Sequence, residues 1–246
     1  MLRVYLTNIE ELKNLTIDDM IFSDQRKEKI EKIKHEEDKQ LSRAVELLLI
    51  YGLKQIDPEI QVPLPIKAEE SGNLLLEKDG EPIYFNLSHA KEYAACAISD
   101  APVGIDVECV KTRDIEHMDK ILHPQEMAIL SFVTNPEEKK KFFYECWVTK
   151  ESYLKNLGLG LSVRPGDFAV NEDKLEINED KLKANEDPNA GIRKLEKRYV
   201  HIYKSAEIEN ADWKFDASYR MAVCTQKKDA DAKVTILKAD DLKTML

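Results

Sequence analysis

The amino-acid sequence predicts an α+β protein of the mixed α/β type, and three observations lead to this class. Short runs with strand-like patterns recur along the chain, beginning at residues 2–7. Longer segments, such as 136–157, repeat apolar residues at three- and four-residue steps, which is typical of helices. Strands and helices follow one another irregularly, and this favours an α+β or mixed α/β architecture.

The N-terminal part of the chain is expected to form a strand, a helical region and then a series of turns. The strand covers 2–7, and helical spacing runs from Ser23, a suitable cap, to about Leu53. The first helical turns are dense in charge, which fits either a solvated face or a basic edge that contacts phosphate. The residues alone favour the solvated face. Residues 57–82 are rich in proline and glycine and predict turns, with a hairpin in 74–85.

The remainder of the chain supplies most of the expected strands. Two helical patterns cover 124–133, with proline at the first helical position, and 136–157. Residues 171–197 repeat Asn-Glu-Asp at a seven-residue spacing, but Pro188 and Gly191 break the pattern. We therefore expect a polar surface hairpin or loop there, and no coiled coil. The expected strands are 83–87, 94–98, 103–107, 199–204, 219–225 and 234–238, before a short terminal helix.

Composition excludes several functional classes. The 246 residues include 37 Lys+Arg and 47 Asp+Glu, a net charge of −10, which argues against a general nucleic-acid binder. No apolar run is long enough for a membrane span, and the N-terminus has the pattern of a strand and not of a signal peptide. The four cysteines form no CxxC pair, which favours reduced thiols in a cytoplasmic protein. Any nucleotide or carrier site must then be a local basic patch on an acidic body.

The segment 103–108 places two carboxylates side by side. In a strand, Val103, Ile105 and Val107 share one face. Gly104, Asp106 and Glu108 share the other face, where the glycine leaves space beside the two acids. Neighbouring carboxylates repel one another unless a cation neutralises them. A solvent-facing edge strand with two harmless acids explains this segment alone equally well.

The helical pattern 136–157 has charged residues where its apolar stripe should continue. The stripe passes through Lys150 and Glu151, and Lys155 lies one turn beyond Glu151 on the same side. Charges on a buried stripe are costly unless they are paired or bound to an ion. A surface Glu–Lys pair is the simpler explanation, but the interrupted stripe favours a functional role.

Together, the two segments indicate a site for phosphoryl transfer. Asp106, Glu108 and Glu151 could surround one Mg²⁺, which prefers oxygen ligands and shares its shell with substrate phosphates. Lys150 and Lys155 would then be available to phosphate oxygens. The sequence contains no GxxxxGK[ST] loop and no kinase motif set, so the phosphate donor is not held in a P-loop.

These residues carry a resemblance to a known family. The segment 104–108 (GIDVE), followed by 147–155 (WVTKESYLK), resembles the paired signature of the 4′-phosphopantetheinyl transferases, and most of all their Sfp-type branch. Residues 85–89 (FNLSH) and 158–162 (GLGLS) also look like that family. The likeness extends thinly from about Ser23 to Thr225.

The resemblance implies a fold and an activity. The family's fold has two similar α/β halves related by a pseudo-twofold, with coenzyme A and magnesium between them. The resemblance implies an N-terminal half at residues 1–102. The C-terminal half, with the metal site and the polar insert, would cover residues 103–246. The implied reaction transfers the 4′-phosphopantetheine arm of coenzyme A to a serine of an apo acyl or peptidyl carrier protein and releases 3′,5′-ADP. The length implies a monomer, because the short branch of the family needs subunits to build the same cleft.

The resemblance also implies roles for individual residues. The metal ligands are Asp106, Glu108 and Glu151, and Glu151 is the candidate base for the carrier serine. Lys155 is implied to contact the pyrophosphate, and Lys150 is implied to assist in that contact. The residues implied beside the 3′-phosphate are Arg26, Lys29, Ser88 and His89. With these matches, His89 is interpreted as functional, whereas a lone histidine after a strand is more often structural. Trp147 is expected to pack in the core.

Two departures from the family pattern leave alternatives open. Glu81 stands where the family often has lysine, and Leu41 stands where it often has arginine. Arg43, two residues on, points about 200° away on a helix and does not replace it. These changes put coenzyme A affinity in question and support a non-catalytic relative that binds coenzyme A or a carrier. A magnesium-dependent phosphohydrolase using the same acids is a more distant alternative.

Overall fold

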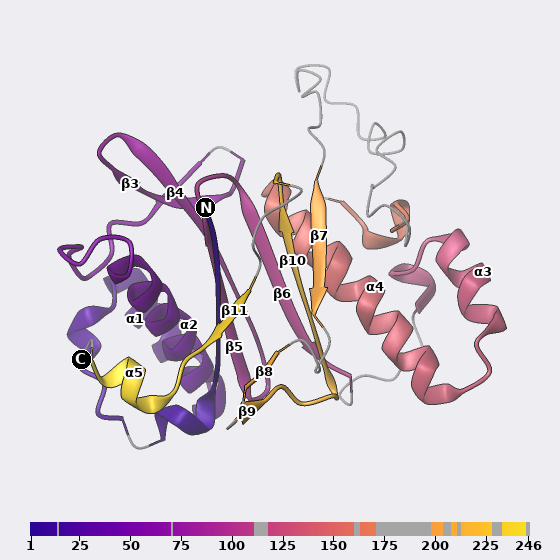
Figure 1. Cartoon of the computed structure of the whole chain (residues 1–246), viewed down its shortest axis with the longest axis horizontal. Helices are drawn as coiled ribbons and strands as arrows, with labels where there is room; N and C mark the ends of the chain where they lie inside the picture. The colour runs from indigo at the N-terminus through magenta and orange to yellow at the C-terminus, as the bar shows by residue number, and fades with distance from the viewer. Residues whose placement is uncertain are drawn as a thin grey trace.

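The computed structural model describes residues 1–13, 15–69, 71–110, 118–159, 163–170, 198–203, 208–210, 213–227 and 233–244. It confirms the mixed α/β class: helices lie on both sides of two central sheets. In Figure 1, α1, α2 and α5 lie to the left of the strands, and α3 and α4 lie to the right. Within the described residues, no helix is both long and apolar enough to cross a membrane.

The larger sheet has the strand order β11-β1-β5-β4-β3-β2. Its pairs are antiparallel except for β1 and β11, which run parallel. The β3–β4 turn has positive φ at Asp79 (54°) and Gly80 (83°), as a tight hairpin turn requires. The strands are β1 (Leu2–Asn8), β2 (Lys67–Ala68), β3 (Leu74–Lys78), β4 (Glu81–Ala90), β5 (Tyr93–Ser99) and β11 (Val234–Ile236).

The second sheet has the order β6-β10-β7 and is antiparallel. Its strands are β6 (Val103–Cys109), β7 (Tyr199–Tyr203) and β10 (Tyr219–Thr225), and a separate small pair joins β8 (Glu209–Asn210) to β9 (Trp213–Lys214). The helices are α1 (Asp24–Lys32), α2 (Glu36–Lys54), α3 (Pro124–Phe132), α4 (Pro136–Leu157) and α5 (Ala239–Lys243).

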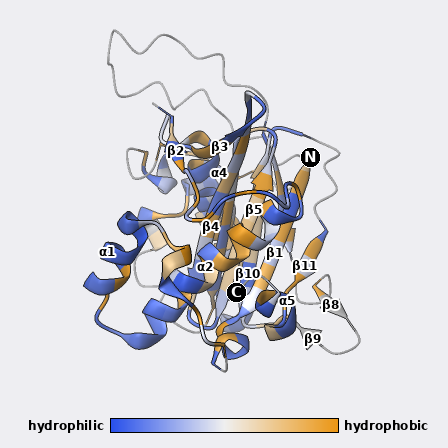
Figure 2. Cartoon of the chain, turned by 90° about the vertical axis from the view of Figure 1, so that its left-hand side faces the viewer, coloured by the Kyte–Doolittle hydropathy of each residue, from blue (hydrophilic) through white to orange (hydrophobic). Residues whose placement is uncertain are grey.

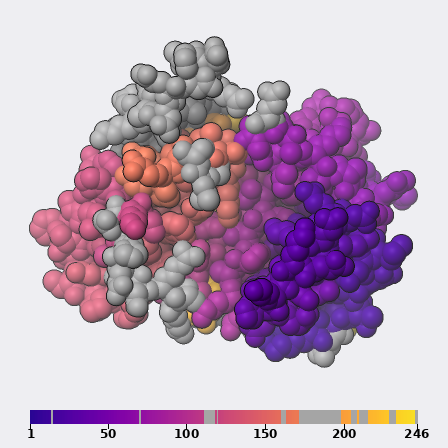
Figure 3. Space-filling model, turned by 180° about the vertical axis from the view of Figure 1, so that it is seen from behind, coloured from indigo at the N-terminus to yellow at the C-terminus, as the bar shows by residue number. Residues whose placement is uncertain are grey.

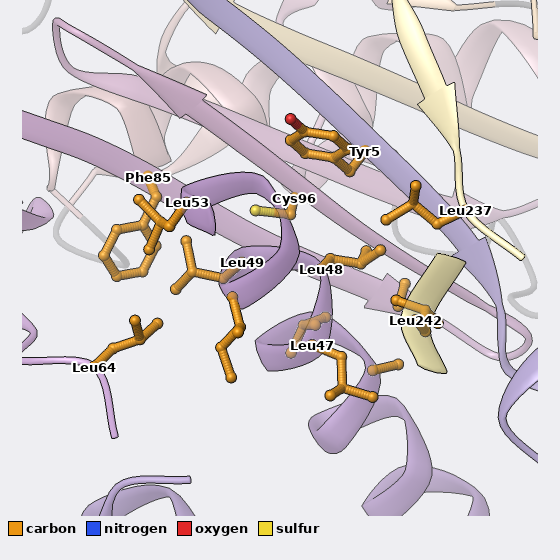
Figure 4. Packing of buried hydrophobic residues seen from close by; sticks show 14 of the residues in the cluster. Tyr5, Leu47, Leu48, Leu49, Leu53, Leu64, Phe85, Cys96, Leu237 and Leu242 are labelled. Carbon is orange, nitrogen blue, oxygen red and sulfur yellow. The ribbon is translucent and has the colours of Figure 1, made fainter. Parts of the chain in front are cut away.

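In the part of the chain that the structure describes, four apolar clusters hold these layers together, and the fourth packs α3 against the first half of α4. The first lies between α2 and the larger sheet and includes the run Leu47–Leu49 (Figure 4). The second fills the space between the two sheets, where Leu6 and Ala97 face Ile105. The third packs α4 against β10 and β7. Each buried leucine contributes about 2 kcal/mol from burial alone, so these clusters supply most of the driving force. By contrast, most residues of α1 are hydrophilic (Figure 2).

The order of elements repeats along the chain. The series β1, α1, α2, β4, β5 is followed by β6, α3, α4, β7, β10, and the strand order β1-β5-β4 matches β6-β10-β7. Viewed from behind, the first series and the second occupy opposite sides of the molecule (Figure 3). The predicted division at 102/103 falls between β5 and β6; it stays a prediction.

The helical region expected from Ser23 to Leu53 is divided. α1 ends at Lys32 because Ile33 is extended (φ −74°, ψ 131°), and α2 begins at Glu36. No glycine or proline marks this break, so it could not be predicted from breaker residues. The loop or hairpin expected at 171–197, and residues 160–162 of the predicted signature, lie outside the described residues.

Candidate active site

Strand β6 and helix α4 approach closely because of one glycine. A Cβ atom at Gly104 would lie 1.9 Å from the backbone oxygen of Ser152 and 2.5 Å from the nitrogen of Asn156. Any larger residue would therefore push α4 away from the strand. The predicted alternation along β6 is confirmed, since Val103, Ile105 and Val107 pack between the sheets while Gly104 faces α4.

The carboxylate of Asp106 lies at the junction of the two sheets. Its Oδ1 accepts hydrogen bonds from Lys155 Nζ (2.7 Å) on α4 and from Ser88 Oγ (2.9 Å) on β4. The side chain of Asp106 is nearly buried, and its Oδ2 has no hydrogen-bond partner among the described residues. Strand β4 from the first series and α4 and β6 from the second thus meet at one carboxylate.

Lys155 is held in place by three acceptors. Besides Asp106, its ammonium donates to the backbone oxygen of Ile105 (3.0 Å) and to Ser88 Oγ (3.3 Å). The end of α4 is fixed from the other half: Gly158 has a left-handed φ of 70°, and a Cβ there would lie 2.0 Å from Ser71 O. The predicted pyrophosphate role requires Lys155 to exchange at least one of its acceptors for a phosphate oxygen.

Glu108 is oriented by a tryptophan. Trp147 Nε1 on α4 donates to Glu108 Oε1 at 3.1 Å. Trp147 was expected to pack in the core, and it does contact the cluster of α4 and β10, but its polar edge faces the acid. Glu151 lies one turn after Trp147 and one turn before Lys155, on the same face of α4. Its neighbours on that face, Trp147 and Lys155, donate hydrogen bonds to Glu108 and Asp106.

The donor set suits a magnesium ion that shares its shell with phosphate. No group of three or more His, Cys, Asp and Glu side chains is close enough to hold a metal within the described residues. The three predicted ligands are therefore not gathered into one cluster. Mg²⁺, however, is usually bound through one or two carboxylates, with water and substrate phosphates completing the shell. The buried, unpartnered Oδ2 of Asp106 is the atom that fits this role best.

The hydroxyl of Ser88 is fully engaged within the protein. Its hydroxyl donates to Asp106 and accepts from Val107 N (3.2 Å) and Lys155, which uses its single proton and both lone pairs. It is 7% exposed. A phosphate oxygen accepts hydrogen bonds, so it would need the proton that Asp106 already receives. The predicted contact of the Ser88 hydroxyl with the 3′-phosphate would therefore require Ser88 to release Asp106.

Lys150 is not directed toward the site. Its side chain is fully buried, and its ammonium donates to Glu126 Oε2 (2.6 Å), Ile121 O (2.9 Å) and Pro165 O (2.8 Å). Burial lowers the pKa of Lys150, while the charge of Glu126 acts in the opposite direction. The interrupted stripe on α4 therefore reflects a buried ion pair at Lys150, and the expectation that this lysine assists at the phosphate has no support here.

A basic group lies beside the junction. His89, next to Ser88 on β4, has a lowered pKa, first because surrounding atoms shield the ring from water and then because Lys29, Lys155 and Arg26 are close enough to repel a proton. The charges of Lys29 and Arg26 thus act on His89, and the role predicted for these three residues at the 3′-phosphate stays a prediction. Arg26 also donates from Nε to the buried Glu46 (2.9 Å), so part of its guanidinium is already engaged.

The two departures from the family pattern, Leu41 and Glu81, lie in different surroundings. Leu41 is 2% exposed and packs in the core of α2, so its position faces the interior. Arg43 is engaged with Asp19 (3.4 Å) and Glu36 (3.5 Å) and does not replace an arginine at position 41. Glu81 is exposed at the start of β4, opposite Lys78.

Three residues whose side chains hold the surroundings of the site in place were not predicted from the sequence. Asn86 Oδ1 accepts from Ile105 N (3.2 Å) and joins β4 to β6 two residues before Ser88. Glu126 neutralises Lys150, and Trp147 orients Glu108. Asn86 and Ser88 are alternate polar residues in a strand, and this shared face was the available signal. Nothing local in the sequence connects Glu126 with Lys150.

Comparisons with known proteins agree with this site. The model of the 4′-phosphopantetheinyl transferase superfamily matches residues 102–224, half of the chain. The 4′-phosphopantetheinyl transferase gsp of Aneurinibacillus migulanus is 34% identical over 111 residues, 42% of this chain and 46% of that protein. The transferase psf-1 of Bacillus pumilus is 28% identical over 180 residues (69% and 67%), and ffp of Bacillus subtilis is 23% identical over 222 residues (89% and 89%).

The matched regions cover different shares of these relatives. The match with gsp spans less than half of that protein's length, whereas those with psf-1 and ffp span two thirds or more. The family match itself includes β6, which carries Asp106 and Glu108, and α4, which carries Glu151 and Lys155. The chain belongs to the 4′-phosphopantetheinyl transferase superfamily.

Proposed function

We propose that the protein transfers the 4′-phosphopantetheine arm of coenzyme A to a serine of an apo acyl or peptidyl carrier protein, with Mg²⁺. The observation that carries the proposal is the junction at Asp106, where Lys155 and Ser88 hold Oδ1 and leave a buried Oδ2 without a partner. A cation and an acid held together between two sheets suit the binding of a metal–pyrophosphate group. Family membership gives this arrangement its reaction class.

The proposed step is a single displacement at phosphorus. The carrier serine oxygen forms a bond to the β-phosphorus of coenzyme A, and the bond from that phosphorus to the bridging oxygen breaks. The electron pair stays on the departing 3′,5′-ADP, and the serine proton passes to Glu151 directly or through a water. Asp106 and Glu108, with Glu151 as the third predicted ligand, would hold Mg²⁺, which would supply neutralisation of the pyrophosphate charge. Lys155 stabilises the leaving oxygen.

The basic group beside the junction is proposed to hold the nucleotide end. Lys29 on α1 is exposed, His89 on β4 is partly shielded from water, and Arg26 pairs with the buried Glu46. Burial of the ring, and then the positive charges of Lys29, Lys155 and Arg26, lower the pKa of His89. A 3′-phosphate placed there would relieve this repulsion. His89 would gain a proton more readily once the anion is bound.

The proposed partner is an apo carrier protein, and the proposed assembly is a monomer. One chain contributes β4 from the first series and β6 and α4 from the second to the same junction. A second copy is therefore not needed to complete it. We place the protein in the cytoplasm, where coenzyme A and carrier proteins are present.

Intact-mass spectrometry tests the proposal directly. An apo acyl carrier protein incubated with the protein, coenzyme A and Mg²⁺ should gain the mass of one phosphopantetheine group. Asp106→Ala and Glu151→Ala should abolish the gain, whereas Glu138→Ala, which removes an exposed acid of α4 paired with Lys141, should not. A gain that survives both site substitutions contradicts the assignment of these acids.

One observation favours a second candidate, a non-catalytic relative that binds coenzyme A or a carrier. Leu41 faces the core and Arg43 is engaged elsewhere, so α2 presents no arginine at these positions to the nucleotide. Calorimetry with coenzyme A separates the two candidates. Binding without modification of several different carriers supports the second, and phosphate release without a carrier would indicate a phosphohydrolase instead.

A further inference from the structure

The hydroxyl of Ser88 has a use that differs from the predicted phosphate contact. It is the shared partner of three groups: it donates to Asp106 Oδ1 (2.9 Å) and accepts from Val107 N (3.2 Å) and Lys155 Nζ (3.3 Å). Its capacity for hydrogen bonds is therefore filled from within the protein. The residue is also nearly buried, so a ligand would have to displace one of these partners.

These contacts fix one orientation of the Asp106 carboxylate. Ser88 and Lys155 both bond to Oδ1, from β4 and from α4, so rotation that exchanges the two oxygens would break both bonds. Oδ2 remains buried without a hydrogen-bond partner in the described part of the chain. A buried carboxylate oxygen without a partner is costly, and this cost is removed when a cation binds to it.

We infer that Ser88 is a positioning residue that holds the Asp106 carboxylate so that Oδ2 is presented to the divalent cation, and that its hydroxyl does not bind the 3′-phosphate. The inference rests on the proposed function for the identity of the cation. Outer partners that orient a metal-binding carboxylate commonly change metal affinity by about 10- to 100-fold when removed. The effect of Ser88 should thus be seen in metal binding and not in nucleotide binding.

Asn86 offers a matched control. Like Ser88, it lies on β4 and bonds to a backbone nitrogen of β6, that of Ile105, at 3.2 Å. No contact between its side chain and Asp106 is present among the described hydrogen bonds. Asn86→Ala therefore removes a comparable link between β4 and β6 without touching the carboxylate, and it reports what a purely structural loss does.

The experiment measures Mn²⁺ binding by electron paramagnetic resonance and 3′,5′-ADP binding by calorimetry, on protein whose folding is checked by thermal unfolding. For Ser88→Ala we expect Mn²⁺ affinity to fall about tenfold with 3′,5′-ADP affinity nearly unchanged. Ser88→Thr, which keeps the hydroxyl, should restore most of the Mn²⁺ affinity. Asn86→Ala should leave both affinities within about twofold of the starting protein. In an Asp106→Ala background, Ser88→Ala should have no further effect on Mn²⁺ affinity, because Ser88 acts through that carboxylate.

Two results would overturn the inference. One is a Ser88→Ala protein that binds Mn²⁺ normally but loses 3′,5′-ADP affinity, since that is the behaviour of a phosphate contact. The other is an equal loss of Mn²⁺ affinity in Asn86→Ala, which would indicate a general weakening of the β4–β6 junction. Neither readout requires carrier modification, so failure of the proposed transferase activity is detected separately, by the mass assay on the unmodified protein.

Discussion

The two helix pairs of the molecule carry buried ion pairs of opposite polarity. Arg26, the third residue of α1, pairs with Glu46 on α2 at 2.9 Å. Glu126, the third residue of α3, pairs with Lys150 on α4 at 2.6 Å. The first pair keeps its cation partly exposed (15%), whereas both members of the second are sealed from water (0% and 2%).

This difference distinguishes Lys150, which has a structural role, from Arg26, which is proposed to bind phosphate. Lys150 has its three protons directed to Glu126 and two backbone oxygens, so its charge ties α4 to the segments around Ile121 and Pro165. Arg26 is also anchored by its acid, but it lies beside Lys29 and His89. The ion pair at equivalent positions of the two helix pairs therefore stabilises the fold in the second half, and in the first half it holds an arginine of the proposed basic site.

Loss of the sealed pair should have the largest effect. Lys150→Met leaves Glu126 buried and charged, and we expect the free energy of unfolding to fall by about 4 kcal/mol, measured by urea denaturation. Adding Glu126→Gln should recover part of this loss, because the amide removes the charge and its single oxygen still accepts from one of the two backbone amides, His123 N or Val170 N, that now bond to separate oxygens of Glu126. A loss below about 1 kcal/mol would show that the pair is not desolvated.

The close approach of helix and strand gives the next largest effect. At Gly104 the obstacle to a side chain is the backbone of α4, which cannot move alone. Gly104→Ala should cost about 3 kcal/mol and separate Lys155 from Asp106. Thermal unfolding measures the first effect and Mn²⁺ titration the second. Normal metal binding in a folded Gly104→Ala protein would contradict the geometry of this junction.

Loss of Arg26 should change both stability and nucleotide affinity, whereas loss of Lys150 should change stability alone. Arg26→Met leaves Glu46 buried, and we expect a smaller loss of stability than for Lys150→Met, about 2 kcal/mol, because the Arg26–Glu46 pair is partly exposed (15% for Arg26). Because Arg26 belongs to the basic group, 3′,5′-ADP affinity should also fall, by about tenfold. Calorimetry on Arg26→Met and Lys150→Met side by side checks the distinction. Equal nucleotide affinities in the two variants would remove it.

The first half has its own close contact, and it should be more tolerant. A Cβ at Gly52 on α2 would lie 2.5 Å from Ile98 Cδ1 and from Tyr5 Cε2, which are ends of side chains. These ends can shift, and alanine favours a helix over glycine by about 1 kcal/mol. Gly52→Ala should therefore cost only about 1 kcal/mol in urea denaturation. A cost as large as that of Gly104→Ala would mean that this core is equally rigid.

The smallest effect concerns a surface link between the halves. Hydrogen bonds from Lys227 and the N-terminal ammonium outweigh partial burial and lower the pKa of Asp100 to about 2, from 3.8. Its stabilising contribution is therefore present above about pH 4 and is lost as the pH falls toward 2. Because the group is about half exposed, Asp100→Asn should cost less than about 1 kcal/mol at pH 7. The cost should vanish near pH 2 in pH-dependent thermal unfolding, and a cost that persists there would exclude this ionic origin.

The repeat also shows what local patterns could and could not predict. Prolines at positions 124 and 136 marked the starts of α3 and α4 in advance. The break between α1 and α2 has no such marker, although Ile33 and Val133 end their helices in the same way, with an amide bonded to a carbonyl three residues earlier. Comparison of the two halves, 100 positions apart, would have predicted the break.

The sequence by itself determined the mixed α/β class, the alternation of faces along β6 and the face of α4 shared by Glu151 and Lys155. These follow from the periods of strands and helices, which are local properties of the chain. Only the tertiary structure decided that Lys155 pairs with Asp106 while Lys150 pairs with Glu126, and that the Ser88 hydroxyl is used by Asp106. The partner and burial of a charge depend on segments far apart in sequence that packing brings together, and no local pattern records them.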